Sequence, residues 1–220
     1  MTMSRRTWVL GHVVGAMVLV GCHRAGATAG APDGGPPANL TEASYPGALA
    51  TALTGPDFLA RQKLDGSIRD RKIRGEAVVQ KQGEGLTLIG LTPFGTKAFV
   101  AQQRGGQVES KVMAPEGKLP FPPRFMLLDI NRVLYLGLPG APLADGRHEG
   151  TVGEERVVEV WQDGALVERR FSRVDGKPAG EIVIAFEGGM RDGKLPARVR
   201  LENGWFGYAI VIDTVQWQAL

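Results

Sequence analysis

GLTLIGLTPFGTKAFVAQQ, residues 85–103, contains two strand-length runs separated by a turn that is centred on Pro93 and Gly95. Proline and glycine at the centre of such a stretch favour a reversal of the chain. The stretch therefore predicts two antiparallel strands, at residues 86–91 and 97–102. The first run is apolar on both of its alternating faces, whereas a strand with one face in water alternates more cleanly.

The same rhythm continues on both sides of this stretch. Short apolar runs alternate with turns rich in Gly, Asp or Asn about every ten residues, which is typical of antiparallel hairpins. Asp163-Gly164 and Asn203-Gly204 are dipeptides that supply the positive φ of tight turns. We predict further strands at residues 58–64, 73–80, 108–113, 156–162, 166–174, 181–186, 197–202 and 208–215.

Two segments read as helices. Pro122-Pro123 precede RFMLLDINRVLY, residues 124–135, whose apolar side chains form a face broad enough for a buried helix. A shorter leading helix is predicted from Tyr45 to Leu53, because two leucines there lie four residues apart.

Composition and charge exclude some classes of function. The chain has 220 residues, with 43% hydrophobic and 22% charged side chains, which is ordinary for one globular domain. Without residues 1–21 it keeps 24 basic and 23 acidic side chains, so its formal charge is near +1. No run of Lys and Arg is interleaved with aromatic residues, so we expect no nucleic-acid partner.

The N-terminus reads as a secretion signal. Arg5 and Arg6 precede an apolar stretch from Trp8 to Val20, which is short for a membrane span but suits a signal peptide. Leu-Val-Gly-Cys ends it and resembles the bacterial lipobox, so we predict lipidation of Cys22, the single cysteine. The alternative is a plain signal peptide or weak anchor in which Cys22 is a chance residue. The residue after Cys22 is not aspartate, which favours the outer over the inner membrane.

These features suggest three parts. Residues 1–21 form the lipoprotein signal peptide. Residues 22–55 hold the lipidated cysteine, a tether rich in Gly, Ala and Pro, and the short leading helix. Residues 56–220 form the folded domain, which would face the periplasm from the outer membrane.

Three segments together carry a family resemblance: residues 85–103, Leu-Gly-Leu-Pro-Gly at 136–140 after the proline-bounded helix, and ENGWFGYAIVIDTVQWQAL at 202–220. Their order resembles the DUF3261 family of bacterial lipoproteins over residues 58–220, and more distantly the lipoprotein receptor LolB and its periplasmic partner LolA. The resemblance implies an α+β, mainly β fold: a curled antiparallel sheet, or open half-barrel, of about eleven strands. One or two helices would cover its concave face, above an apolar cavity that accepts acyl chains.

A cavity of this kind would be lined by apolar side chains from the strands and the helix. The candidates are Leu86, Leu88, Phe99, Leu127, Leu128, Ile182, Ile184, Tyr208 and Ile210. The alternative is a well-covered core in which these residues fill the space themselves. Phe94 and Trp205 are candidate loop tips for contact with lipid or a partner.

Signatures of catalysis are scarce. His148 is the one histidine after residue 23 and lies in a Gly-rich loop, and Glu154-Glu155 read as a solvated turn. No second His or Cys stands at metal-ligand spacing, so we expect no metal, no cofactor and no enzymatic activity. The sequence predicts a membrane-anchored envelope lipoprotein that binds a lipid, an acyl chain or a lipoprotein in transfer or localisation. The alternative is a non-enzymatic adaptor with a filled core that contacts an envelope protein.

Overall fold

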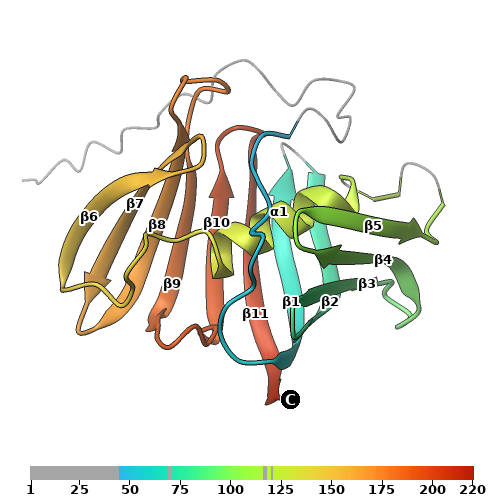
Figure 1. The fold of residues 1–220 in the computed structure, drawn as a ribbon. Helices are drawn as coiled ribbons and strands as arrows, with labels where there is room; N and C mark the ends of the chain where they lie inside the picture. The colour runs from blue at the N-terminus through green and yellow to red at the C-terminus, as the bar shows by residue number, and fades with distance from the viewer. Residues whose placement is uncertain (1–44, 69–70, 116–117, 120) are drawn as a thin grey trace, which may run out of the picture. The chain divides into compact units, whose positions relative to one another are not determined.

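The computed structural model describes residues 45–68, 71–115, 118–119 and 121–220. Within them, eleven strands form a single antiparallel sheet that is not closed, in the order β5-β4-β3-β2-β1-β11-β10-β9-β8-β7-β6. One helix, α1 (Pro123–Leu134), crosses one face, and the sheet bends around it (Figure 1). The predicted fold class is therefore confirmed. The signal peptide and Cys22 lie outside the described residues.

The sheet consists of two meanders. The first meander contains β1 (Phe58–Ile68), β2 (Arg71–Gln82), β3 (Gly85–Leu91), β4 (Lys97–Arg104) and β5 (Gln107–Val112). The second meander follows α1 and contains β6 (Gly146–Val152), β7 (Glu155–Gln162), β8 (Ala165–Arg173), β9 (Ile182–Met190), β10 (Arg198–Asn203) and β11 (Tyr208–Ala219). The two meanders are joined only by the pairing of β1 with β11. Every other pairing in the sheet joins two strands that follow each other in the chain.

The seam between β1 and β11 is long. It runs antiparallel from Phe58 opposite Ala219 to Ile68 opposite Tyr208, with one register shift after Arg61. Gly66 lies opposite Ile210, and a Cβ atom at Gly66 would meet the backbone carbonyl of Ala209 and lie 2.8 Å from the Cα of Ile210. Glycine therefore allows the close backbone approach that joins the two meanders.

Ten strands lie where the sequence predicts them, and β6 is the one it misses. GRHEGTV contains one large apolar residue, so no period-two pattern marks it. β6 is an edge strand that pairs with β7 alone, and a strand in this position needs no apolar face. Asp163-Gly164 has positive φ at both residues, as predicted for the tight turn between β7 and β8. The same prediction is wrong for Asn203-Gly204, because Gly207 has the positive φ in the turn between β10 and β11.

The two helix predictions have different outcomes. α1 begins at Pro123, where the missing amide hydrogen of proline costs nothing, and it buries the predicted apolar face. The leading helix from Tyr45 to Leu53 is wrong, because this segment has no regular secondary structure. Gly47 has φ +129, and its missing side chain leaves room for the Arg132 guanidinium, so the chain cannot be helical there.

Candidate functional site

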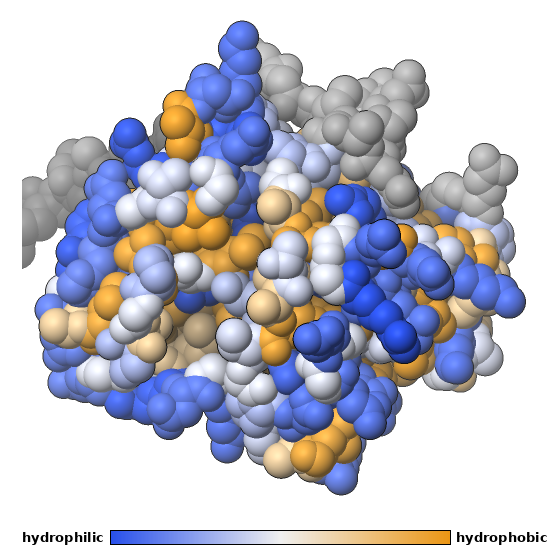
Figure 2. Space-filling model, viewed as in Figure 1, coloured by the Kyte–Doolittle hydropathy of each residue, from blue (hydrophilic) through white to orange (hydrophobic). Residues whose placement is uncertain are grey.

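The predicted lining residues all lie in one core between the sheet and its cover. The apolar core includes Leu86, Leu88, Phe99, Leu127, Leu128, Ile182, Ile184 and Tyr208 as buried residues, and Ile210 packs against it half-buried. Seen from the side of α1, apolar residues reach the surface between charged ones across the middle of the view (Figure 2). The structure thus brings the nine residues into one core, although their role in binding a ligand stays a prediction.

A small pocket lies beneath α1. A cavity of about 20 Å³ lies between the helix and the strands β1, β2, β10 and β11. It holds about one water molecule and is far smaller than an acyl chain. Its lining contains none of the nine predicted residues and consists of Gln62, Val79, Ile130, Val133, Leu134, Leu195, Val199 and Ile212.

An irregular segment before β1, residues 45–55, covers the core beside α1 (Figure 1). We call it the cover segment. It buries Tyr45, Leu49, Ala50 and Leu53. The Tyr45 ring stacks on Phe125 of α1, with centroids 4.6 Å apart. The last eleven residues of the predicted tether are therefore packed on the folded domain.

A buried ion pair joins the cover segment, α1 and the second meander. Arg132 of α1 donates from Nη2 to Oε1 of Glu155 at 2.7 Å and from Nε to Oε2 at 3.2 Å. Nη2 also donates to the carbonyl of Pro46 at 2.7 Å, and Nη1 donates to the hydroxyl of Tyr45 at 3.2 Å. The guanidinium lies over the ring of Trp205, 5.0 Å from its centroid. A fully buried charge is thus neutralised and hydrogen-bonded on several sides.

Asp129 is the second charged group of α1 in this region. The hydroxyls of Tyr45 and Tyr208 both donate to its carboxylate, and Asn203 donates to both hydroxyls at 2.8 and 3.0 Å. Burial raises the pKa of the Asp129 carboxyl above its ordinary value, and the nearby Arg132 guanidinium only partly offsets this. Burial also raises the pKa of Tyr45 and Tyr208, so both hydroxyls remain protonated donors.

The raised pKa of Asp129 predicts a pH dependence of stability. Between the pKa of an unfolded Asp, about 3.9, and the raised folded value, the folded chain binds more protons than the unfolded chain. The contribution of Asp129 to the free energy of unfolding is therefore greatest below this interval and falls as pH rises through it. We expect Asp129→Asn to gain stability relative to the unmodified protein between pH 4 and pH 7, measured by urea unfolding.

Asp57 provides a control of opposite sign. Its hydrogen bond from Lys81 at 2.7 Å lowers the pKa of the carboxyl, so its contribution is present above the unfolded pKa and lost as pH falls. Asp57→Asn should therefore lose stability relative to the unmodified protein as pH rises from 3 to 6. Parallel pH profiles for the two variants would contradict the assignment for Asp129.

A second buried ion pair holds the end of α1. Arg169 of β8 donates to Oε1 of Glu159 at 2.7 Å and to the carbonyls of Arg132 and Val133 at 2.8 and 3.1 Å. These carbonyls lie in the last turn of the helix, where a cation satisfies groups that lack a partner within the helix. Glu159 also accepts from the amide of Leu138 and from the indole of Trp161, at 3.2 and 3.0 Å.

Asn131 connects α1 to the cover segment and to β4. Its side chain donates to Gln103 Oε1 and to the carbonyl of Leu127, each at 2.7 Å, and accepts from the amide of Ala50 at 2.8 Å. Among the described residues, only Tyr135 Oη and Thr214 Oγ1 are buried side-chain atoms without a partner. Neither atom belongs to the groups around Asp129, Asn131 and Arg132.

The two predicted loop tips have different surroundings. Phe94 is 92% exposed, in the turn between β3 and β4. The prediction of an exposed tip is wrong for Trp205, which is 4% exposed and donates from Nε1 to the carbonyl of Gly180 at 3.0 Å. Asn203 explains this placement: its side-chain oxygen accepts the amides of Trp205 and Phe206, each at 3.1 Å, and turns both rings into the core.

The other candidates from the sequence lie near the edge of the second meander. His148 is on β6 and contacts the carbonyl of Ala144 through Nε2 at 2.6 Å. Glu154 is exposed as predicted, but the prediction of a solvated turn is wrong for Glu155, which is buried against Arg132. Within the described ranges, no group of three or more His, Cys, Asp or Glu could hold a metal ion, and no helix is long and apolar enough to span a membrane.

Sequence reasoning missed the buried charges, although one signal pointed to them. Asp129 and Arg132 are charged residues on a helix that is largely buried, and a buried charge requires a partner. Their partners Tyr45 and Glu155 lie 84 and 23 residues away in the sequence. No local pattern identifies them.

Comparison with known proteins gives the following similarities. No curated protein matches the chain. A LolA superfamily protein from Nitrosomonas europaea is similar with a TM-score of 0.42 and 13% identity, over 77% of this chain and 89% of that one. A putative outer membrane lipoprotein-sorting protein domain from Vibrio parahaemolyticus has a TM-score of 0.40 and 8% identity, over 77% and 87%. A DUF1329 family protein from Desulfovibrio piger has a TM-score of 0.40 and 10% identity, over 76% and 86%. No ligand or activity follows from similarity at this level.

The family assignment rests on the sequence itself. The family model described as "protein of unknown function (DUF3261)" matches residues 59–216, which include α1, β2 to β10 and most of β1 and β11. The match begins just after the start of β1, so the cover segment lies outside it. The chain belongs to the DUF3261 family.

Proposed function

We propose that this chain is an envelope lipoprotein, anchored to the outer membrane through Cys22, that binds a lipid or acylated ligand on the concave face of its sheet. The ligand would take the place of the cover segment. The observation that carries this proposal is the cover segment itself: it shields the apolar core without regular secondary structure, and it is the C-terminal end of the predicted tether segment. Such binding requires no catalytic side chain.

The energies make this exchange feasible. Re-exposing Leu49 and Leu53 would cost about 1.5–3 kcal/mol each. Tyr45 would lose its stacking and hydrogen bonds, at a further cost of a few kcal/mol. An acyl chain gains about 0.8 kcal/mol for each buried methylene, so a palmitoyl chain gains on the order of 11 kcal/mol. The acyl chain and the cover segment are therefore competitors of similar strength.

The proposed anchor and the proposed exchange lie next to each other in the chain. One acyl chain holds a protein to a membrane only marginally, whereas several chains on Cys22 would make the attachment permanent. A released cover segment would lengthen the tether by eleven residues. Phe94, at its exposed turn, is a candidate for contact with the lipid or acylated partner that delivers the ligand.

Native mass spectrometry of the mature chain with Cys22→Ser, exported to the periplasm, tests the proposal. We expect bound phospholipid or fatty-acid masses, and we expect Tyr45→Ala with Leu49→Ala to raise the lipid-bound fraction severalfold, because both changes weaken the competitor. Leu166→Ala is the matched control: it removes a fully buried side chain of β8 that is not one of the nine candidate lining residues, and it should lower stability without raising lipid occupancy. An equal rise in both variants would show non-specific binding by a loosened core and would contradict the exchange.

A second function is favoured by the small cavity and the well-satisfied polar groups around it. In this alternative the chain is an adaptor with a permanently filled core, and it positions an envelope protein through surface contacts. A clean apo mass for both the unmodified chain and the cover-segment variant, with no uptake of an added fluorescent fatty acid, would favour the adaptor over the lipid-binding function.

A further inference from the structure

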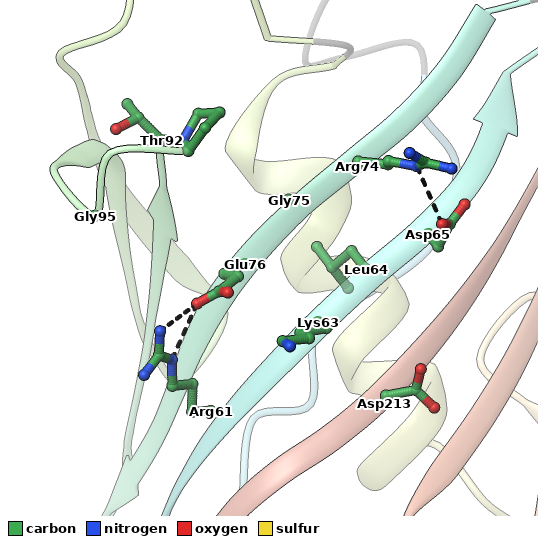
Figure 3. Close-up of a pocket in the computed structure, with 11 residues that line it drawn as sticks. Arg61, Lys63, Leu64, Asp65, Arg74, Gly75, Glu76, Thr92, Gly95 and Asp213 are labelled. Atoms are coloured by element: carbon green, nitrogen blue, oxygen red, sulfur yellow. Dashed lines mark hydrogen bonds and ion pairs between the residues drawn. The ribbon is translucent and has the colours of Figure 1, made fainter.

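The face of the first meander that is opposite α1 carries apolar side chains that nothing covers among the described residues. Along β3, Leu86 and Leu88 point into the core, so the alternating Ile89 and Leu91 point outward, and both are only partly buried. α1 is the one helix in the described chain, and Figure 3 shows it behind β1 and β2 when the sheet is viewed from this outer face. The apolar outer positions of β3 therefore lack the packing partner that such residues usually have.

The strand register places these side chains in rows across the outer face. Val78 of β2 lies opposite Ile89 of β3, which lies opposite Val100 of β4. Leu91 lies at the next outward position of β3. The turn that carries the exposed Phe94 follows Leu91 directly. We call this apolar group with its bordering charges the outer patch, formed by Val78, Ile89, Leu91, Phe94, Val100 and the five charged residues Arg61, Lys63, Glu76, Lys97 and Lys111.

Cations border the apolar residues of the outer patch on both sides. The register places Arg61 and Lys63 of β1 opposite Val78 and Glu76, Lys97 opposite Leu91, and Lys111 of β5 opposite Val100. Glu76 is paired with Arg61 at 2.5 Å (Figure 3). In the described part of the chain, no carboxylate lies within salt-bridge distance of Lys63, Lys97 or Lys111. The four cations and one carboxylate of the outer patch have a summed formal charge of +3.

An open hollow of about 600 Å³ lies along the same strands. Its walls include Arg61 and Lys63 from β1, Glu76 from β2 and the turn residues Thr92, Pro93 and Gly95 (Figure 3). Asp65 and Asp213 also line it, but they are paired with Arg74 and Arg198 at 3.2 and 2.6 Å. The hollow is thus lined by three cations and three carboxylates, and Lys63, which lies opposite Asp213, is the cation among them that forms no salt bridge in the described chain.

The second meander differs in charge on the corresponding outer surface. Several of its exposed arginines have acidic neighbours, for example Arg156 with Glu149 at 3.5 Å and Arg170 with Glu168 at 2.7 Å. Arg198 and Arg200 likewise lie near Glu187. These pairs offset part of the positive charge of the second meander, whereas Lys63, Lys97 and Lys111 of the outer patch form no such pair in the described chain.

We propose that the outer patch docks on the surface of an anionic phospholipid bilayer. Phe94 and its apolar neighbours enter the boundary between headgroups and acyl chains, and Lys63, Lys97 and Lys111 contact the phosphates. The proposal does not depend on a ligand at the concave face. Such a bilayer would cover the outward apolar residues of β3, and its phosphates would neutralise the neighbouring lysines.

Flotation with vesicles tests this proposal, using the mature chain with Cys22→Ser and vesicles of phosphatidylglycerol and phosphatidylethanolamine. We expect binding that weakens at 0.5 M salt and on vesicles of phosphatidylcholine alone. Lys63→Glu with Lys97→Glu and Lys111→Glu should reduce partitioning at least tenfold. Arg147→Glu with Arg156→Glu and Lys177→Glu is the matched control: it changes the net charge equally, but in the second meander, and should reduce partitioning less than twofold.

Phe94→Ser tests the apolar contribution, and because its side chain is exposed, it should leave the unfolding midpoint unchanged. We expect it to reduce partitioning severalfold at both low and high salt.

Equal losses in the two triple variants would show that only net charge matters, and this result would overturn the proposal. Absence of binding to the anionic vesicles by the unmodified chain would also overturn it. Lipid occupancy in native mass spectra should be the same in the patch variants and the unmodified chain, so the failure of one proposal leaves the other standing.

Discussion

Replacement of Glu155 by alanine is expected to lower the free energy of unfolding by about 3–5 kcal/mol, because it removes the carboxylate that forms the shorter ion pair of the buried Arg132 guanidinium. Arg132 is fully buried and donates two hydrogen bonds to this carboxylate. Its remaining partners are the carbonyl of Pro46, the hydroxyl of Tyr45 and, at 3.4 Å, the carboxylate of Asp129, whose pKa is raised by burial. The shift of the urea unfolding midpoint at constant slope measures the effect.

Arg156→Ala is the matched control for Glu155→Ala. Arg156 is the next residue of β7, but its ion pair with Glu149 is exposed on both sides, and such pairs contribute about 0–1 kcal/mol. Glu155→Leu combined with Arg132→Met should be less destabilising than Glu155→Ala alone, because it removes both charges of this ion pair and leaves Asp129 with its hydrogen bonds from Tyr45 and Tyr208. If Glu155→Ala were as mild as Arg156→Ala, the buried ion pair would not hold these elements together.

Replacement of Gly66 by alanine is expected to destabilise the fold by about 3 kcal/mol. The added Cβ would collide with backbone atoms of Ala209 and Ile210, and backbone in the middle of a strand pair cannot move aside as a flexible side chain can. This contact lies in the pairing of β1 with β11, the only one that joins the two meanders. Thermal and urea unfolding of the purified variant measure the loss.

Gly75→Ala separates this collision from the general effect of replacing glycine in a strand. Gly75 lies on β2, and no atom lies within 4 Å of a Cβ placed there. Its replacement should change stability by less than about 1 kcal/mol, and the lower entropy of the unfolded chain favours a gain. If Gly66→Ala and Gly75→Ala had the same effect, the close approach at the seam would be irrelevant to stability.

The buried polar groups have a consequence for the proposed exchange of the cover segment. Tyr45 donates to Asp129, the carbonyl of Pro46 accepts from Arg132, and the amide of Ala50 donates to Asn131. The polar contacts of the cover segment therefore involve these three residues of α1 or side chains that are hydrogen-bonded to them. A ligand that displaced the cover segment would leave these groups in need of new partners. An acylated ligand with a polar headgroup meets this requirement better than a hydrocarbon alone.

The sequence by itself determined the strand framework and α1. Alternating apolar runs and turn residues identify ten of the eleven strands, and the prolines at 122 and 123 mark the start of the helix. These signals are local, because the period of a strand and the conformational limits of proline and glycine act within a few residues. β6 was not predicted because this edge strand contains one large apolar residue and therefore has no alternating apolar pattern.

Only the tertiary structure decided how the concave face is filled. Leu49 and Leu53 suggested a helix, but the Arg132 guanidinium occupies the space beside Gly47 and fixes an irregular path. Glu155 looked solvated because its sequence neighbours are polar, yet it is buried as the counter-ion of Arg132. In each case the deciding partner is distant in sequence, and the free energy of pairing a buried charge outweighs local preferences of a few tenths of a kcal/mol.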